Sequence, residues 1–318
     1  MKAVAKAAET APAKARGDNL MIGQIVKGIG GFYYVKTPYG IFECRGRGAL
    51  KSKGMKLQVG DRVDISEVEL SREARDRGYL HEGVIEKIHE RKNEFLRPPI
   101  VNVDMICVTF AGKDPEPAFS MIDKFILASE VKDTEALVVI NKCDLLTEEE
   151  REAMKAISSG AYRVIETSCV TGEGLDELKE ILKGKVVAFA GPSGAGKSTL
   201  VNSIVPEADM ETGSISLKTQ RGRHTTRHVE ILEAEGGGLV YDTPGFTSFD
   251  IPEIEEDELR NLYPEIEKLN GQCRYDNCRH LKEPGCAVKE AVKAGKISAV
   301  RYASYKTNMK EIREKRKY

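Results

Sequence analysis

The feature that most constrains the fold is a glycine-rich run that directly follows an apolar stretch, 185–190. The run reads Gly191-Pro192-Ser193-Gly194-Ala195-Gly196-Lys197-Ser198-Thr199. It fits G-x-x-x-x-G-K-[ST], in which backbone N–H groups converge on phosphate oxygens where a strand passes into a helix. We therefore expect all nine residues to contact a nucleotide, with Lys197 at the β- and γ-phosphates and the Ser198 hydroxyl on Mg²⁺. A strand, this loop and a helix at 198–204 predict a parallel α/β sheet.

A second motif, Asn141-Lys142-Cys143-Asp144, follows the apolar stretch 136–140 and fits NKxD. The Asp144 carboxylate can accept hydrogen bonds from N1–H and the 2-amino group of guanine, whereas adenine has neither donor. Asn141 is expected to brace the base and the neighbouring loops, and the Lys142 stem to lie along the ring. By itself the pattern equally describes a turn with an N-cap Asp. Beside a phosphate loop it predicts that the ligand is GTP or GDP.

Two further segments fit a guanine-nucleotide site. Asp242 and Gly245 form a DxxG element, in which the Asp holds Mg²⁺ through water and the Gly N–H senses the γ-phosphate. Thr167, Ser168 and Cys169 follow an expected strand at 162–166, where a loop that cradles guanine would lie, although this match is loose. We expect Asp242, Gly245, Ser168 and Cys169 to belong to the nucleotide site.

The stretch between the phosphate loop and DxxG is polar and contains Thr225 and Thr226. Such a segment suits a mobile switch with a magnesium-ligating threonine, and an ordinary strand start would explain the pair equally well. The position after DxxG often supplies a glutamine that orients the attacking water. Here it is Phe246, which has no hydrogen-bonding group, so hydrolysis by the isolated chain is expected to be slow.

The motifs stand in an unusual order. NKxD precedes the phosphate loop, which precedes DxxG, whereas an ordinary GTPase begins with its phosphate loop. We therefore expect a circularly permuted α/β GTPase domain over residues 93–252. Its parallel strands should be the near-continuous apolar runs, which are 103–110, 136–140, 162–166, 185–190 and 238–241.

The residues before this domain suggest a small β-barrel. Five short β-type runs broken by glycine occupy residues 20–92, which is the size and strand count of an OB-fold, a common nucleic-acid binder. A generic β-domain would give the same pattern. The loop after the third run is basic, which suits contact with a polyanion, and contains Arg45, Arg47, Lys51, Lys53 and Lys56. Residues 1–19 are rich in Ala and Lys and are expected to be a mobile tail.

Residues 253–318 contain the pattern Cys273-x₄-Cys278-x-His280-x₅-Cys286. Three thiolates and an imidazole complete a tetrahedral Zn²⁺ site, and a closed site of this kind is structural. Because no secretory segment begins the chain, we favour metal ligands in a reducing cytoplasm over disulfides. We expect a mainly helical zinc domain that ends in a basic helix from residue 298.

The charge pattern points to partners at the two ends of the chain. The formal net charge is only −1, but an acidic middle separates two basic ends, which suggests that the ends meet a nucleic acid. Merely solvated faces would look similar. The longest apolar runs are far shorter than the roughly 18 residues of a membrane-spanning helix, so no membrane contact is expected. The basic surface is expected to include Arg274, Arg279, Lys282, Lys289, Lys293, Lys296, Arg301, Lys306, Lys310, Arg313, Lys315, Arg316 and Lys317.

The three parts together closely resemble the small-ribosomal-subunit biogenesis GTPases, the RsgA or YjeQ family, which join an OB-fold, a permuted GTPase and a zinc domain in this order. The similarity covers about residues 20–300, including Val101-Asn102-Val103-Asp104 and Arg223-His224-Thr225-Thr226. It implies a monomeric GTP hydrolase that acts late in assembly of the 30S ribosomal subunit, binds 16S rRNA and is stimulated by the small subunit.

The resemblance also implies a catalytic residue. In this family a histidine just before the switch threonines is the proposed replacement for the missing glutamine, and it corresponds to His224. A surface histidine near the phosphates is the simpler interpretation of the same residue. The competing function is an RNA-binding translation or stress regulator that GTP merely stabilises, with incidental turnover. Stimulation of turnover by small subunits would separate the two functions.

Overall fold

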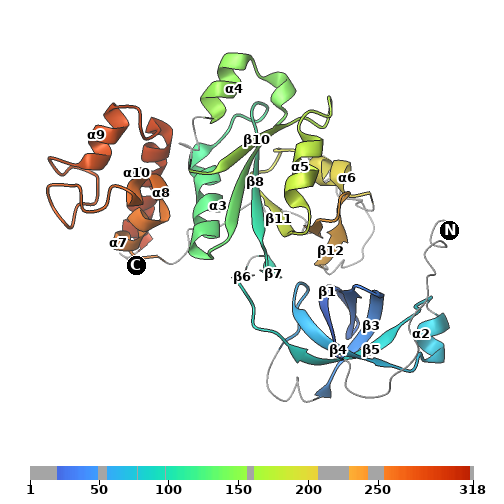
Figure 1. The fold of residues 1–318 in the computed structure, drawn as a ribbon. Coiled ribbons are helices and arrows are strands. Elements are labelled where there is room, and N and C mark those ends of the chain that lie inside the picture. Colours follow the sequence, from blue (N-terminus) through green and yellow to red (C-terminus); the bar gives the residue numbers. More distant parts are fainter. Residues whose placement is uncertain are drawn as a thin grey trace.

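The computed structural model describes residues 20–48, 56–76, 78–96, 98–155, 161–206, 229–242 and 254–315. The expected mobile tail, residues 1–19, lies outside the described residues. Three units follow one another along the chain, and the central unit contacts both of the others (Figure 1).

The N-terminal unit is a closed five-stranded barrel, as the sequence predicts. Strands β1, β2 and β3 form an antiparallel meander, β3 pairs in parallel with β5, and β4 pairs with both β5 and β1 to close the barrel. Alternation builds its core, since Val63 and Ile65 on β4 are fully buried while Arg62, Asp64 and Ser66 between and beside them are not. The elements are β1 (Met21–Ile29), β2 (Phe32–Thr37), β3 (Gly40–Gly46), β4 (Arg62–Val68), α2 (Arg72–Asp76) and β5 (Glu82–Ile88).

The basic loop of the barrel is only partly within the described residues, because Lys51 and Lys53 lie outside them. The Arg45 guanidinium lies 4.4 Å from the centre of the Phe32 ring, and Arg47 forms an ion pair with Glu86. Both cations therefore have partners within the barrel itself.

The central unit is a sheet covered on both faces, with strand order β10-β9-β8-β11-β13-β12. All pairings are parallel except the one between β12 and β13. Every residue of β8 and β11 is buried, as expected of parallel strands under helices on both faces. The strands are β8 (Met105–Ala111), β9 (Glu135–Asn141), β10 (Arg163–Thr167), β11 (Val186–Ala190), β12 (Glu230–Glu233) and β13 (Leu239–Asp242).

Helices on the two faces create two separate cores. Helix α3 buries Ile122 and Phe125 against one face, while α5 and α6 bury Leu178 and Leu200 against the other. The helices are α3 (Phe119–Val131), α4 (Glu148–Lys155), α5 (Leu175–Leu182) and α6 (Lys197–Ile204). Elements that were not predicted from the sequence include α2, α5, β12 and the short hairpin of β6 (Glu94–Leu96) and β7 (Pro99–Val101).

The barrel and the central sheet are joined by strand pairing. Lys27 on β1 pairs with Glu230 on β12, which makes one continuous sheet of 11 strands. The Lys27 ammonium lies 2.8 Å from the Glu230 carboxylate, and Lys36 on β2 forms an ion pair with Glu233. Two antiparallel neighbours from different units thus share both backbone and side-chain contacts.

The C-terminal unit is mainly helical, as expected, and packs against α3 (Figure 1). Its elements are α7 (Glu256–Leu259), the 3₁₀ turn η3 (Arg260–Leu262), α8 (Pro264–Glu267), α9 (Ala287–Lys293) and α10 (Ala299–Lys315). Helix α10 contacts α3 directly, where Lys124 and Glu311 form an ion pair of 2.9 Å. None of the helices within the described ranges is long and apolar enough to cross a membrane.

The prediction that Arg301 contributes to a basic surface is wrong. Its side chain is 1% exposed and forms ion pairs with Asp123 on α3 and with Glu265 on α8. Arg279 and Arg313, also assigned to that surface, share the carboxylate of Glu256. The reason is tertiary, because the face of α10 that carries Arg301 meets two acidic side chains from other helices.

Candidate nucleotide site and metal centre

The glycine-rich loop lies at the carboxyl end of β11, between β8 and β13. Gly191, Gly194 and Gly196 have φ values of +148°, +79° and +82°, a region in which L side chains are strained. A Cβ at Gly191 would lie 1.8 Å from the Thr109 carbonyl oxygen of β8. Glycine is therefore required both for the turn and for close packing against the next strand. Helix α6 begins at Lys197, so its first N–H groups point toward the loop.

The Lys197 side chain is folded onto this loop. Its Nζ donates hydrogen bonds to the carbonyl oxygens of Gly191 and Pro192, each at 2.8 Å. Burial lowers the pKa of Lys197 to about 8, because the ammonium loses contact with water. A di- or triphosphate would supply a compensating negative charge. Ser198 follows on the first turn of α6 and is half-buried.

Asn141 joins the NKxD motif to the phosphate loop. Its side chain is 2% exposed, and its Nδ2 donates to the Ala195 carbonyl oxygen at 2.9 Å. Its Oδ1 accepts a hydrogen bond from Thr167 Oγ1 at 3.1 Å. A Cβ at Gly196 would lie only 2.4 Å from Asn141 Nδ2. The carboxyl ends of β9, β10 and β11 therefore meet at one side chain, where ligands of open α/β sheets bind.

The rest of NKxD forms a tight turn beside the same loop. Lys142 has a left-handed backbone with φ +58°, and its Nζ donates to the carbonyl oxygen of Asp114. The following 3₁₀ turn η1 (Cys143–Leu145) buries Cys143 and leaves Asp144 exposed. The turn thus presents Asp144 at the surface, three residues after Asn141, which contacts the phosphate loop.

The loop after β10 is shaped by Ser168. The Ser168 Oγ accepts the N–H groups of Val170 and Thr171, both at 3.2 Å, so this buried hydroxyl stabilises a turn. Cys169 is half-buried. Burial raises the pKa of its thiol, and the negative charge of Asp144 adds to this effect.

Asp242 ends β13, the strand beside the phosphate loop on its other side. Burial and repulsion from Glu230, its partner across the β12–β13 ladder, raise the pKa of Asp242. A cation near this carboxylate would relieve both effects. The Ser198 hydroxyl and the Asp242 carboxylate are hard oxygen donors of the kind that Mg²⁺ prefers. Four expected site residues lie outside the described residues, namely His224, Thr225, Thr226 and Gly245.

A separate group of side chains in the C-terminal unit can hold a metal ion. The ligand atoms of Cys273, Cys278, His280 and Cys286 all lie within 4.8 Å of one another. His280 Nδ1 lies 3.5 Å from Cys273 Sγ and 3.4 Å from Cys286 Sγ, and the two sulfurs are 4.0 Å apart. Ligands about 2.0–2.3 Å from one tetrahedral Zn²⁺ would be about 3.5–3.8 Å apart. The cluster therefore fits a metal such as zinc, and all three of its cysteines are free.

Helix α10 supports the loop that carries these ligands. The hydroxyl of Tyr302 donates to the His280 carbonyl oxygen at 2.6 Å, and that of Tyr305 donates to the Arg279 carbonyl oxygen at 2.9 Å. His280 itself has a left-handed backbone with φ +60°. Burial raises the pKa of Cys278 to about 12, so thiolates in this pocket require a cation.

Asp114 is absent from the sequence-based expectations for the nucleotide site. Its carbonyl oxygen accepts a hydrogen bond from the Lys142 ammonium. Because Asp114 acts through its backbone, the identity of this residue gave no signal in the sequence. Thr167 was expected only as part of the loop that cradles guanine, and the structure shows that its hydroxyl orients Asn141.

Comparison with known proteins finds relatives that match most of the chain. The RsgA GTPase family model matches residues 88–252, and the RsgA N-terminal domain model matches residues 22–80. The small ribosomal subunit biogenesis GTPase RsgA of Clostridium perfringens strain 13 is 46% identical, over 93% of this chain and 99% of that protein.

Two solved structures have the same overall architecture. The crystal structure of YjeQ from Thermotoga maritima superposes with a TM-score of 0.75 at 34% identity, over 92% of this chain and 99% of that one. YloQ, described as a circularly permuted GTPase, superposes with a TM-score of 0.77 at 33% identity, over 96% and 99%. The permuted motif order is thus matched by a permuted fold.

Proposed function

The chain belongs to the RsgA GTPase family and is a GTP-hydrolysing enzyme, and we propose that it acts late in assembly of the small ribosomal subunit, where it contacts 16S rRNA. Relatives at up to 46% identity carry the name small ribosomal subunit biogenesis GTPase. A monomer in the cytoplasm, where ribosomes are assembled, fits this role. The proposed domains are residues 20–92, 93–252 and 253–318, after a tail of residues 1–19.

The observation that carries the proposal is the hydrogen bond from Asn141 Nδ2 to the Ala195 carbonyl oxygen. It holds the motif expected to select the base against the loop expected to bind the phosphates. One ligand with a guanine at one end and phosphates at the other can therefore span both. Asp144 would accept N1–H and the 2-amino group of guanine, and an adenine nucleotide would leave that carboxylate without donors.

The residues around the phosphates have separate tasks. Lys197 would exchange its two carbonyl partners for β- and γ-phosphate oxygens. Ser198 and Asp242 would hold Mg²⁺, which neutralises charge on those oxygens. We propose that Thr225 or Thr226 adds a ligand and that His224 orients the attacking water. The glutamine position is Phe246, so a partner that orders this switch should accelerate turnover.

The two ends of the chain would bind RNA. The C-terminal unit carries exposed cations that can contact phosphates. A structural Zn²⁺ would stabilise its loop through Cys273, Cys278, His280 and Cys286. The barrel adds a second surface at the other end of the GTPase unit (Figure 1). Contacts to phosphates would make binding weaken steeply as salt rises.

GTP turnover measured with and without purified 30S subunits tests the proposal. We expect slow turnover alone and a large stimulation by the subunit. Turnover that the subunit leaves unchanged would instead favour an RNA-binding regulator that GTP only stabilises.

Asp144→Asn tests the proposed recognition of guanine. The asparagine amide is a donor facing the 2-amino donor, so GTP should bind at least tenfold more weakly, while XTP, with a carbonyl at that position, should bind better than GTP. A variant that keeps its preference for GTP would contradict the assignment of Asp144.

A further inference from the structure

Tyr241 lies on β13 immediately before Asp242, but its side chain points away from the nucleotide site. Successive side chains of a strand point to opposite faces, so Tyr241 points away from the side that Asp242 takes. Its ring is 1% exposed and belongs to a core that also contains Val26 of the barrel. The residue beside a proposed magnesium ligand is thus buried where the barrel meets the GTPase unit.

The Tyr241 hydroxyl contacts backbone groups of two other segments, at Val59 and Val101. It lies 2.6 Å from the Val101 carbonyl oxygen and 3.1 Å from the Val59 carbonyl oxygen, either of which can accept its proton. It also accepts the Val101 N–H at 3.3 Å. Val59 belongs to the barrel, and Val101 ends the hairpin that connects the barrel to the central sheet.

Gly60 makes room for this hydroxyl. A Cβ at Gly60 would lie 1.7 Å from the Tyr241 oxygen and 2.7 Å from the Val101 carbonyl oxygen, and the φ of Gly60 is +96°. The Gly60 carbonyl oxygen in turn accepts Asn102 Nδ2 at 2.9 Å and Gln24 Nε2 at 3.3 Å. The barrel loop therefore encloses the phenol closely.

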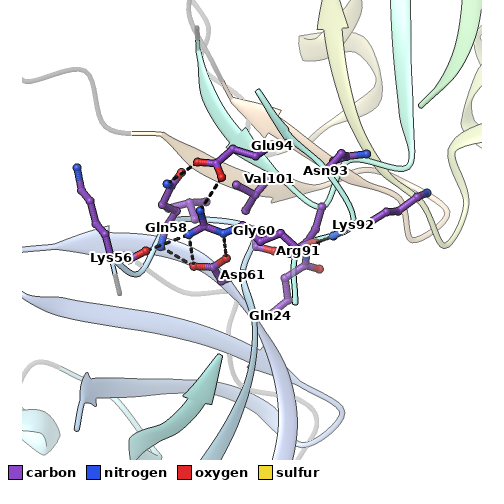
Figure 2. A network of polar contacts seen from close by, with 12 residues as sticks. Gln24, Lys56, Gln58, Gly60, Asp61, Arg91, Lys92, Asn93, Glu94 and Val101 are labelled. Atoms are coloured by element: carbon purple, nitrogen blue, oxygen red, sulfur yellow. Dashed lines mark hydrogen bonds and ion pairs between the residues drawn. The ribbon is translucent and has the colours of Figure 1, made fainter. Parts of the chain in front are cut away.

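A polar network holds that loop in place (Figure 2). Asp61 is fully buried and accepts two hydrogen bonds from Arg91, at 2.8 and 3.1 Å. Arg91 also pairs with Glu94 at 3.0 Å and donates to the Lys56 carbonyl oxygen at 2.9 Å. Because a bidentate arginine–carboxylate pair is strong and has a specific geometry, it stabilises the barrel loop that surrounds the Tyr241 hydroxyl.

The barrel also holds the strand on the other side of Asp242. Glu230 on β12 is the cross-strand partner of Asp242, and its carboxylate is paired with Lys27 of β1 at 2.8 Å. Two like charges face each other across this ladder, which favours their separation. The ladder between β11 and β13 ends at Val240, so a contact of Tyr241 would help to hold the end of β13 that carries Asp242.

We propose that Tyr241 is a positioning residue, whose hydroxyl fastens β13 to the barrel loop at Val59 and to Val101 and thereby sets the place of the Asp242 carboxylate. This inference rests on the proposed role of Asp242 in holding Mg²⁺. It assigns the barrel a part in building the nucleotide site, in addition to any contact with RNA.

Tyr241→Phe removes only the hydroxyl and keeps the buried ring. We expect the Mg²⁺ concentration at half-maximal tightening of fluorescent GDP binding to rise about fivefold, the effect of one lost hydrogen bond. GDP affinity in the presence of a chelator should change less than twofold, because Asp242 has no role there. Amide hydrogen exchange should accelerate in segments 56–61 and 98–103, whether or not nucleotide is present.

Tyr305→Phe is the matched control. It deletes a buried hydroxyl that also donates to a backbone carbonyl, but in the C-terminal unit. It should leave both the Mg²⁺ dependence and the exchange of those two segments as in the wild type.

Two results would overturn the inference. One is an unchanged Mg²⁺ dependence in Tyr241→Phe, and the other is an equal loss of GDP affinity with and without Mg²⁺, which indicates general loosening. Wild-type protein that binds GDP without any Mg²⁺ dependence would instead refute the proposed magnesium site itself. The wild-type titration therefore separates failure of the inference from failure of the proposed function.

Discussion

Asn141 Nδ2 lies 2.9 Å from the carbonyl oxygen of Ala195, 54 positions further along the chain. This contact joins the two motifs that we propose recognise opposite ends of one nucleotide. Because the donor sits at the end of β9 and the acceptor in the loop after β11, it also explains how a permuted chain can keep a GTPase site. Strand neighbours, and not chain order, bring the motifs together.

The first prediction concerns this bond. Asn141→Ala leaves the buried Ala195 carbonyl and the Thr167 hydroxyl without a partner, each of which costs about 1–3 kcal/mol. We expect GDP affinity to fall at least tenfold in a fluorescence titration. Asn261→Ala, which changes an exposed asparagine of the C-terminal unit, should bind GDP as the wild type does. Equal affinities for the two variants would refute the role of Asn141.

The second prediction follows from the pKa of Lys197, which burial lowers to about 8. At pH values between about 8 and the ordinary pKa of lysine, the unfolded chain binds more protons at this side chain than the folded chain does. The free energy of unfolding of the nucleotide-free protein should therefore increase as pH rises through this range. Phosphates would restore the protonated form. Nucleotide binding near pH 8.5 should therefore take up a fraction of a proton, and affinity should fall above pH 8.

Calorimetry of GDP binding in two buffers of different ionisation enthalpy measures this proton uptake. At pH 6.5 the same titration should show none at Lys197, because the ammonium is already protonated there. A heat of binding independent of buffer at pH 8.5 would contradict the prediction.

The third prediction concerns the cysteine–histidine cluster. Cys278→Ser should abolish stoichiometric zinc binding, measured by elemental analysis, and should lower the thermal stability of the C-terminal unit. Cys44→Ser changes a cysteine of the barrel that is far from the cluster along the chain, and it should retain zinc. Cys278→Ser should bind GDP as tightly as the wild type does, because the residues proposed to bind the nucleotide lie in the central unit. Full zinc content in that variant would exclude Cys278 as a ligand.

The fourth prediction tests the buried ion pairs of Arg301. Arg301→Met leaves Asp123 and Glu265 buried without their cation, which costs about 3–5 kcal/mol. Denaturant unfolding should therefore show a much lower midpoint than in the wild type. Lys306→Met, on an exposed face of the same helix, should change the midpoint little. Similar midpoints for both variants would show that Arg301 is exposed in solution.

The sequence by itself determined the parts whose chemistry is local. The phosphate loop, NKxD and the four clustered ligands are short patterns, each with the residue types that its chemistry requires, and buried parallel strands appear as apolar runs. Five barrel strands and the permuted order of the central unit were predicted for the same reason, and the structure confirms both.

Only the tertiary structure decided which distant residues become partners. Arg301 looks like one more cation of a basic helix, but it meets Asp123, 178 positions away, and is buried. Tyr241 looks like an ordinary strand residue, and only folding brings its hydroxyl to Val101, 140 positions away. The physical reason is that periodicity and short motifs record what each segment needs, whereas the partner that meets this need depends on how segments far apart in the chain pack together.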